Sequence, residues 1–458
     1  MPAGRVVRVL NRSSLVDHGE REMREVALDL VEDALAALSP AAALSRAVLV
    51  EGEELIISGR RYDLSGFERV VVLGAGKASA ELALTLEELL GSHLADGLVV
   101  VPRHPEVVPA RIRLVEADHP LPSEASVGSG RALVEMAQGL GEKDLAICVF
   151  TGGSSALASL PPPGVPASDK AALHQLLLAS GMPIVEINTV RKHVSSIKGG
   201  RLARTIAPAR ILNLTVSDVV GDPLDCITDP TVQDASTVAD AVSVLEDHEL
   251  WHEVPGSVRE YLRTCAEAES PELSDIDIET VLVTRGRDAI DAVVASARSR
   301  GLTGVRLGDL LEGEAATVGR VLATLARESQ IEAAPWPRSA VVIGCGGECT
   351  VSLGPDADRR FGQGGPSQEA AVGAALGLVG VDGVVAAFID TDGSDGGTVV
   401  AGGLVDWSTE MRARQRGISL RKVLVAHETR AALEALGDAV VTGLTQTNAN
   451  DLVIMLIR

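Results

Sequence analysis

The chain has 458 residues, of which 46% are hydrophobic, 23% are charged and only 2% are aromatic. This length exceeds what one ordinary hydrophobic core holds, so we expect two domains whose cores are built from Val, Leu, Ile and Ala. The formal net charge of −22 argues against a nucleic-acid partner and against an anionic membrane surface, because Lys and Arg clusters bind both.

Neither a membrane segment nor a disulfide framework is expected. The first residues lack the long apolar core of a signal peptide, and no run of about 18 or more apolar residues follows. The five cysteines are odd in number and scattered, and Cys345 and Cys349 lack the second ligand pair that a zinc site needs. We therefore expect a cytoplasmic protein.

The first half of the chain alternates expected strands with expected helices. Residues 20–38 carry apolar side chains at helical spacing and predict the first helix. A strand over 69–73 follows, then a glycine turn over 74–76 and a helix that ends at Leu90. Beyond it we expect strands over 97–101, 144–150 and 209–216, and helices over 125–140, 170–180 and 189–204. This alternation predicts βαβ units and a parallel sheet.

A polar, acidic stretch over 267–277 is the best candidate for a domain boundary. A second α/β series follows, with helices expected over 287–299 and 312–328 and strands over 280–283, 304–307, 339–343, 383–390 and 452–457. We therefore expect an N-terminal domain over 1–270 and a C-terminal domain over 278–458.

A glycine turn after the strand over 69–73 is the first candidate ligand loop. A strand that runs into Gly74-Ala-Gly76 and then a helix can bind phosphate, because a helix N-terminus offers free N–H groups and the positive end of its dipole. The loop is neither a Walker A motif nor a complete dinucleotide fingerprint, since Ser79 stands where a third glycine would fall. Lys77 is placed to meet anionic oxygens, and the alternative is a tight turn with an exposed lysine.

Two more loops of this half combine glycine, hydroxyl or cationic groups. Gly152-Gly153-Ser154-Ser155 follows an apolar strand and predicts an anion nest, with an ordinary Gly-Ser turn as the alternative. The segment 186–200 holds Asn188, Arg191, Lys192, His193 and Lys198, a notable cationic group in so acidic a chain. Arg191 and Lys198 are seven apart, which puts them on one face of the expected helix. The alternative is a solvated helix face with ion pairs.

Carboxylates follow the strand over 209–216. Asp218 lies two residues beyond its end, after Ser217, and Asp222 lies four residues later. Carboxylates at strand ends can hold Mg²⁺ or take a proton from a hydroxyl group. An Asx-turn with a helix cap is the alternative for this segment.

The second half carries three polar loops at strand ends. These are Gly346-Gly347-Glu348, the acidic loop that contains Asp390, Asp392 and Asp395, and the segment 442–451 with Asn448 and Asp451. No glutamate occupies the twelfth position of a calcium loop in the acidic segment, which argues against calcium. Small amide, hydroxyl and carboxylate groups suit the orientation of a hydroxy acid, and plain turn chemistry is the alternative.

Taken in order, these segments resemble the glycerate 2-kinase family, whose members are sometimes labelled hydroxypyruvate reductase and carry a C-terminal MOFRL-type domain. The resemblance covers the chain from about residue 20 to its end, and eight motifs carry it. They are Gly74-Ala-Gly-Lys-Ala78, Thr151-Gly-Gly-Ser-Ser-Ala156, Asn188-Thr-Val-Arg-Lys-His193, Lys198-Gly-Gly200, Ser217-Asp-Val-Val-Gly-Asp222, Gly346-Gly-Glu348, Thr391-Asp-Gly-Ser-Asp-Gly396 and Thr447-Asn-Ala-Asn-Asp451.

The resemblance implies two three-layer α/β/α domains, the first with a Rossmann-like parallel sheet and the smaller second with a mixed sheet, and an active site in the cleft between them. It also implies ATP-dependent phosphorylation with Mg²⁺. The implied catalytic residues are Lys77, Asp218 and Arg191, and the metal candidates are Asp218 and Asp222. The implied ATP-binding residues are Gly74, Gly76, Gly152, Gly153, Ser154, Ser155, Lys198, Gly347 and Glu348. The implied substrate-binding residues are Asn188, His193, Asp392, Asp395, Asn448 and Asp451.

One position departs from the family pattern. Where the family usually reads Gly-Gly-Arg-Asn-Gln-Glu, this chain has Gly364-Gly-Pro366-Ser-Gln-Glu369. Proline carries no charge and no N–H donor, so an active-site guanidinium is missing. A neighbour such as Arg191, Arg359 or Arg360 replaces it, the substrate differs, or activity has been lost.

We therefore expect an ATP-dependent kinase of a small hydroxy acid, with D-glycerate and its product 2-phosphoglycerate as the first hypothesis. The alternatives are a family member that acts on another hydroxy acid, a binding or sensor protein that has lost catalysis, and a nicotinamide-dependent hydroxypyruvate reductase. The expected partners are ATP and the hydroxy acid. A homodimer is compatible with the sequence, which shows no coiled-coil pattern or interface stripe.

Overall fold

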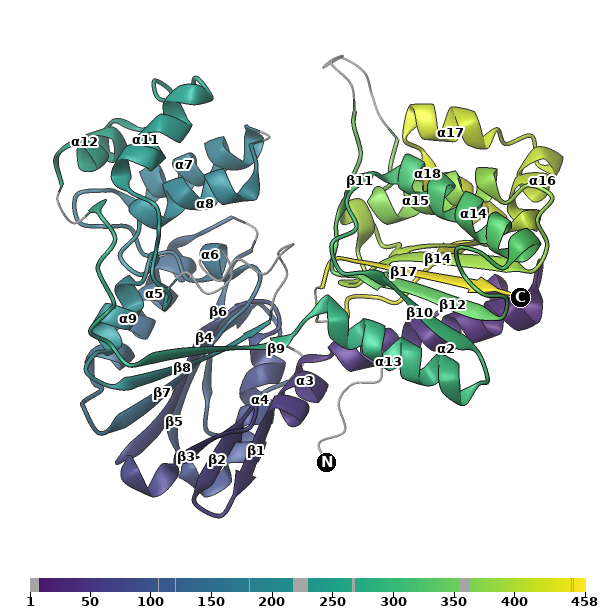
Figure 1. Cartoon of the computed structure of the whole chain (residues 1–458). Helices are drawn as coiled ribbons and strands as arrows, with labels where there is room; N and C mark the ends of the chain where they lie inside the picture. The colour runs from purple at the N-terminus through teal and green to yellow at the C-terminus, as the bar shows by residue number, and fades with distance from the viewer. Residues whose placement is uncertain are drawn as a thin grey trace. The chain divides into compact units, whose positions relative to one another are not determined.

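The computed structural model describes residues 8–105, 107–119, 121–180, 182–216, 230–265, 268–353, 362–445, 447 and 449–458. The chain divides into two compact α/β units (Figure 1). Unit 1 contains the described residues from Ala43 to Val283, and unit 2 contains those before Ala43 and after Val283. Among the helices of the described ranges, none has the length and apolarity to cross a bilayer.

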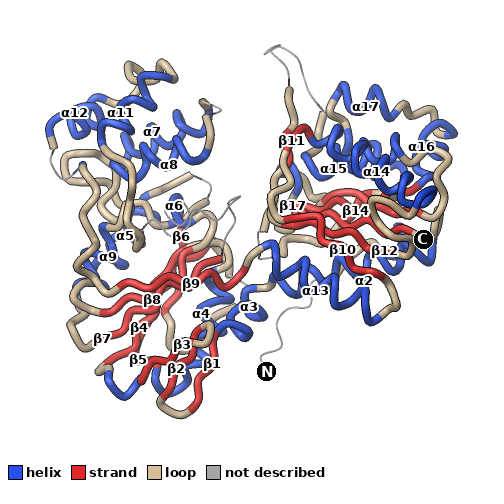
Figure 2. The backbone as a smooth tube through the Cα atoms, in the orientation of Figure 1, coloured by secondary structure: helices blue, strands red, loops and turns tan. Residues whose placement is uncertain are grey.

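Unit 1 is organised around a six-stranded sheet (Figure 2). In sheet order its strands are β6 (Arg113–Ala117), β5 (Leu94–Pro102), β4 (Arg69–Ala75), β7 (Asp144–Phe150), β8 (Arg210–Val216) and β9 (Ile278–Thr284). The pairs from β6 through β8 are parallel. The carboxyl ends of these five strands therefore lie at one edge, which is where open α/β sheets bind ligands.

Helices cover both faces of this sheet because its central strands are apolar on both sides. Alternate residues of β4 enter different cores: Val70 and Val72 pack with α4 (Ser79–Leu90), whereas Val71 and Leu73 pack with α5 (Glu124–Gln138) and α9 (Arg201–Ile206). The α4 side also contacts α3 (Pro40–Ala47) and a small antiparallel sheet made of β1 (Val48–Glu51), β2 (Glu54–Ile57) and β3 (Arg60–Asp63).

A separate helical cluster with its own apolar core completes unit 1. It contains α7 (Ala167–Ala179), α8 (Ile184–His193), α11 (Val238–Asp247) and α12 (Gly256–Thr264). The single helix expected over 189–204 is wrong: α8 ends at His193 and α9 begins at Arg201. Gly199 and Gly200 between them have φ of +61° and +77°, a left-handed backbone that an α-helix cannot continue through.

Unit 2 is built on a mixed six-stranded sheet. In sheet order its strands are β10 (Thr303–Gly308), β12 (Ala340–Cys345), β17 (Asp451–Ile457), β14 (Val384–Asp390), β15 (Gly402–Asp406) and β16 (Ala439–Val440). Only β10 and β12 pair in parallel, and the last strand of the chain, β17, inserts antiparallel between β12 and β14. The short strands β11 (Gly313–Glu314) and β13 (Cys349–Thr350) form a separate parallel pair.

Helices lie on both faces of this sheet as well. One face packs against α2 (Arg21–Leu38) and α13 (Gly286–Ser299), and the other against α14 (Ala315–Glu332) and α15 (Pro366–Gly377). The remaining helices of this unit are α1 (Arg12–Leu15), α16 (Trp407–Gln415), α17 (Leu420–Ala426) and α18 (Thr429–Leu436). The predicted α/β fold class, with a parallel sheet followed by a mixed sheet, is confirmed. An active site between the units stays a prediction.

The N-terminal helix α2 belongs to unit 2, although the expected division at residues 270–278 places it in the N-terminal domain. A buried ion network accounts for this contact. Arg24 is fully buried and donates from Nε to Asp406 Oδ2 at 2.6 Å and from Nη2 to Asp438 Oδ1 at 2.9 Å. Both carboxylates are also fully buried. The amphipathic helix thus brings to the second sheet a cation for both carboxylates, and Asp438 is also paired with Arg412 at 2.7 Å.

Candidate active site

The two glycine loops of unit 1 form one structure at the carboxyl ends of β4 and β7. Lys77 N donates to Gly152 O at 2.9 Å, and Thr151 N donates to Ala75 O at 3.0 Å. Gly76 has φ of +145°, and a Cβ at this position would lie 1.9 Å from Thr151 Oγ1. Glycine is therefore required for the close approach of the two loops. The structure brings together here the six loop residues for which the family resemblance implied ATP binding: Gly74, Gly76, Gly152, Gly153, Ser154 and Ser155.

The side chains of Lys77 and His119 converge over Gly153. A Cβ built on Gly153 would lie 3.0 Å from His119 Cδ2 and 3.3 Å from Lys77 Cγ. Desolvation, and secondarily the charge of Lys77, lower the pKa of His119 to about 4, so the imidazole is neutral at pH 7. Sequence reasoning missed His119. It lies two residues beyond β6, a strand that we did not predict, at the same sheet edge as the glycine loops.

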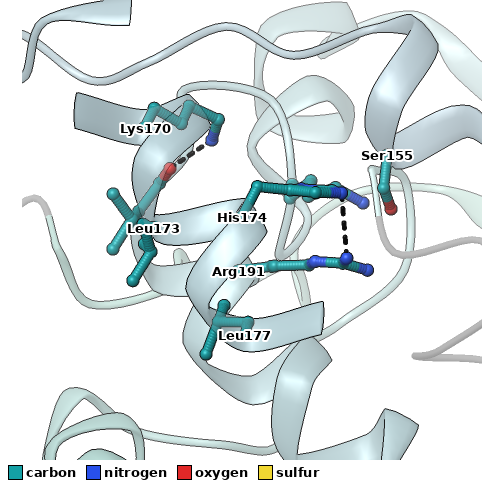
Figure 3. A pocket seen from close by; sticks show the side chains of 8 residues that line it. Ser155, Lys170, Leu173, His174, Leu177 and Arg191 are labelled. Atoms are coloured by element: carbon teal, nitrogen blue, oxygen red, sulfur yellow. Dashed lines mark hydrogen bonds between the residues drawn. The ribbon is translucent and has the colours of Figure 1, made fainter. Parts of the chain in front are cut away.

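A small pocket lies among α6 (Ser154–Leu157), α7, α8 and the turn after α8 (Figure 3). Its polar lining is cationic or neutral, whereas the chain as a whole is strongly acidic. The lining side chains are Ser155, Lys170, Leu173, His174, Leu177, Arg191, Val194 and Lys198. Arg191 and Lys198 were predicted to lie on one face of a single helix. They both line this pocket, but Lys198 does so from the turn that follows the end of α8 at His193.

His174 and Arg191 form the central contact of this pocket (Figure 3). Arg191 Nη2 lies 3.0 Å from His174 Nε2, and Arg191 Nη1 donates to Asn188 Oδ1 at 3.4 Å. A guanidinium group can only donate, so His174 Nε2 accepts and the imidazole is neutral. Burial, followed by the charges of Arg191, Lys170 and Lys198, lowers the pKa of His174 to about 3. His174 could not be predicted as a site residue, because nothing in the residue pattern of α7 indicates that α8 lies beside it.

His193 does not line this pocket. It is fully buried, with Nδ1 2.7 Å from Ala268 O and Nε2 3.3 Å from Ser236 Oγ. The adjacent Lys192 donates to Asp234 Oδ1 at 2.6 Å. Burial alone would raise the pKa of Asp234, but hydrogen bonds from Lys192 and from neighbouring hydroxyl groups hold it below its ordinary value. These contacts give His193 a structural role where the chain bends between α8 and α9, and its predicted contact with substrate stays a prediction.

Three predicted site residues, Asp218, Asp222 and Asn448, lie outside the described residues, as do Arg359 and Arg360. Among the residues that the structure does describe, no group of three or more His, Cys, Asp or Glu side chains is arranged to hold a metal ion.

The polar loops of unit 2 meet at one edge of the mixed sheet. Because β17 is antiparallel to both β12 and β14, the carboxyl ends of β12 and β14 lie beside the start of β17. Asp390 is the direct partner of Asp451 in this register. Gly347 O accepts from Asp451 N at 3.0 Å, and Glu348 follows with its side chain exposed. Gly347, Glu348 and Asp451 are thus brought to one edge, together with the acidic loop after β14.

Asp395 caps the first turn of α15. Its carboxylate accepts from Ser367 N at 3.1 Å and from Gln368 N at 2.8 Å. Pro366 is the first residue of this helix. The N–H group at this position has no partner within a helix, so its absence in proline costs no hydrogen bond, and the fixed φ of proline suits the start of a helix. The replacement of the family's arginine by proline is therefore structurally accommodated, but it supplies no charge.

Burial sets the protonation of this acidic edge. It raises the pKa of Asp395 to about 7 and that of Asp451 to about 6, although Asp451 accepts from Ser367 Oγ at 2.9 Å and from Cys349 N at 2.9 Å. Burial and the nearby charge of Asp392 also raise the pKa of Asp390. Asp392 Oδ1 accepts from Ser394 N at 2.7 Å, the Asx-type turn that was the alternative for this loop.

Comparison with known proteins covers both units. Residues 26–263 match the domain of unknown function DUF4147, and residues 341–451 match the MOFRL family. A glycerate 2-kinase of Pyrococcus horikoshii is 36% identical over 440 residues, which is 95% of this chain and 98% of the relative. A protein of Agrobacterium vitis, provisionally named a hydroxypyruvate reductase, is 41% identical over 85% of this chain and 87% of its own. The crystal structure of a Thermotoga maritima glycerate kinase matches with a TM-score of 0.82 at 33% identity, covering 95% of this chain and all of that one.

The fold and these relatives place the protein among the kinases, which are phosphotransferases. The chain belongs to the glycerate kinase family, in which a DUF4147 domain is followed by a MOFRL domain. The resemblance predicted from the eight motifs is thereby confirmed.

Proposed function

We propose that the protein transfers the γ-phosphoryl group of ATP to the 2-hydroxyl group of D-glycerate, with 2-phosphoglycerate and ADP as products. The observation that carries the proposal is the similarity to the glycerate 2-kinase of Pyrococcus horikoshii, which is 36% identical across 95% of this chain and therefore through both units.

The glycine loops of unit 1 support a phosphate-binding role. Backbone N–H groups of the first loop donate within the protein, Lys77 N to Gly152 O and Ala78 N to Thr151 Oγ1. The side chain of Lys77, in contrast, is exposed at this turn, and its charge attracts phosphate oxygens. In the proposed reaction the substrate's hydroxyl oxygen forms a bond to the γ-phosphorus atom while the bond to the β–γ bridging oxygen breaks. Lys77 would stabilise the negative charge on the transferred group, which is the main task of the protein in phosphoryl transfer.

Mg²⁺ and the acceptor of the hydroxyl proton belong to the same proposal. Mg²⁺, when bound, neutralises charge on the nucleotide phosphates, and Asp218 and Asp222 are the candidate ligands. Asp218 is also the candidate base. Both residues lie outside the described residues, so the proposal assigns them by motif alone.

The alternative function, that of a nicotinamide-dependent hydroxypyruvate reductase, has less support. The turn after β4 lacks the third glycine of a dinucleotide fingerprint, and β5 ends at Pro102 without the acidic residue that binds a nicotinamide ribose. Incubation with NADH and hydroxypyruvate tests it directly: we expect no NADH oxidation, and steady oxidation would favour the reductase.

The kinase proposal is tested by ADP release from ATP and Mg²⁺ with D-glycerate, L-glycerate and glycerol as acceptors. We expect release with D-glycerate and a loss of at least about 100-fold in kcat for Lys77→Ala, because one charge on the transferred group contributes several powers of ten. The matched control is Lys143→Ala, an exposed lysine of the same unit paired with Glu68. No release above background with wild-type protein and D-glycerate would contradict the proposal, and equal loss in both variants would remove Lys77 from it.

A further inference from the structure

The pocket between α7 and α8 has features that the phosphate loops do not explain. It combines three cationic side chains with a hydroxyl group and a wall of aliphatic carbon, and none of its lining side chains is acidic. Its cavity volume is about 10 Å³, room for roughly one water molecule, so the closed part of the pocket admits a single small polar group. These properties suit a small oxyanion attached to a short carbon skeleton.

The cationic groups are held in place by the surrounding helices. Residues Lys170, Leu173, His174 and Leu177 share one face of α7 by their spacing of three and four. Lys170 Nζ donates to Val194 O, the residue at the end of α8, and Lys198 is 4% exposed. Arg191 is fixed by Asn188 on its own helix and by His174 from the neighbouring helix.

His174, the hydrogen-bond partner of Arg191 on α7, does not reduce the positive charge of the pocket. An aspartate or glutamate at position 174 would orient a guanidinium equally well, but it would also cancel one positive charge. A neutral imidazole accepts the hydrogen bond without that cancellation. His174 is 7% exposed, so water competes little with this bond. The arrangement fixes the plane of the guanidinium and preserves its attraction for an anion.

We propose that Ser155, Arg191 and Lys198 bind the carboxylate of the acceptor substrate, and that His174 is a positioning residue that holds Arg191 in the plane this contact needs. The proposal rests on the proposed kinase function and names the group that the pocket binds. A phosphate group of ATP has the same basic chemistry. However, Lys77 beside the glycine loops already offers an exposed cation to a phosphate group, whereas the planar guanidinium of Arg191, held by His174, matches the two oxygens of a carboxylate.

The test compares the KM for D-glycerate with the KM for ATP in four variants. Arg191→Gln should raise the KM for D-glycerate on the order of 10- to 100-fold, the effect of a lost charge-assisted hydrogen bond, and change that for ATP by less than about threefold. His174→Leu should raise the KM for D-glycerate by about tenfold, and His174→Gln, which keeps an acceptor oxygen, should restore most of it. The control is Arg204→Gln, which makes the same change of charge at an exposed pair with Asp275. It should leave both KM values unchanged.

Calorimetry separates this inference from the kinase function. Wild-type protein should bind D-glycerate at least tenfold more tightly than glycerol, which has no carboxylate, and Arg191→Gln should remove the difference. Two results would overturn the proposed carboxylate site: an effect of Arg191→Gln on the affinity for ATP alone, or an equal loss of affinity for D-glycerate in His174→Gln and His174→Leu. In either case, turnover by the wild-type protein would still support the kinase function. Binding of D-glycerate without turnover would uphold the pocket and contradict the proposed reaction, whereas an absence of both would contradict the two together.

Discussion

The buried network around Arg24 gives the sharpest prediction about stability. Arg24→Met keeps the volume of the side chain approximately but removes the cation that contacts Asp406 at 2.6 Å, and Asp406 is fully buried. Asp438 loses its 2.9 Å contact with Arg24 but keeps Arg412 at 2.7 Å. Breaking a buried ion pair from one side typically costs about 3–5 kcal/mol, because the remaining charge is desolvated and unpaired. For a unit of roughly 150–250 residues this corresponds to a loss of about 6–20 °C in Tm.

The assay is thermal and urea unfolding monitored by circular dichroism and by calorimetry, which separates the two units if they unfold in steps. The matched control is Arg414→Met, an arginine of the same unit that is 74% exposed and paired with Glu410 on the helix surface. Its expected effect is below about 1 kcal/mol, as for other surface pairs. A free energy of unfolding for Arg24→Met within about 1 kcal/mol of the wild-type value would refute the proposed importance of this network.

Further predictions concern the phosphate loop, the scaffold and acid stability. Gly76→Ala should lower kcat/KM for ATP at least tenfold and the free energy of unfolding by about 1–3 kcal/mol. The reason is that the new Cβ would clash with Thr151 Oγ1 and that alanine is strained in this backbone conformation. Steady-state kinetics measure the first effect and melting curves the second. His193→Ala should lower Tm by several degrees and leave the KM for D-glycerate unchanged, contrary to its sequence-predicted role. Burial raises the pKa of Asp406 and of Asp438, but Arg24, together with Ser408 for Asp406 and with His18 and Arg412 for Asp438, outweighs it, so both pKa values are lowered. The stabilisation from these carboxylates is therefore present above about pH 4 and is lost as the pH falls towards the folded-state values, which urea unfolding between pH 6 and pH 3 should show.

The central strands of the fold could be predicted from local pattern. The seven residues of β7, Asp144–Phe150, are all buried, and the run was predicted with the observed bounds because it is apolar and ends in glycines. The small antiparallel sheet over 48–63 was missed, since its strands are only four residues long and mix polar with apolar side chains. The helix α15 was missed because buried alanine and glycine on several faces leave no clear helical periodicity.

The candidate site could be predicted only in part. Gly76, Lys77 and Ser155 lie in motifs whose chemistry is visible in the sequence. His119 and His174 have no motif, and their proximity to Lys77 and Arg191 arises from the packing of separate elements. His193 is the opposite case: it is a motif residue with suitable chemistry, but its side chain is fully buried, so its substrate-binding role stays a prediction.

The central claim is that the protein phosphorylates the 2-hydroxyl group of D-glycerate, and phosphorus NMR of the product tests it most directly. We expect the product of wild-type protein, ATP, Mg²⁺ and D-glycerate to show a phosphorus resonance coupled to one proton, that of carbon 2. Coupling to the two protons of carbon 3 would show transfer to the other hydroxyl group, and an absence of any phosphoglycerate while ATP is bound would contradict the account.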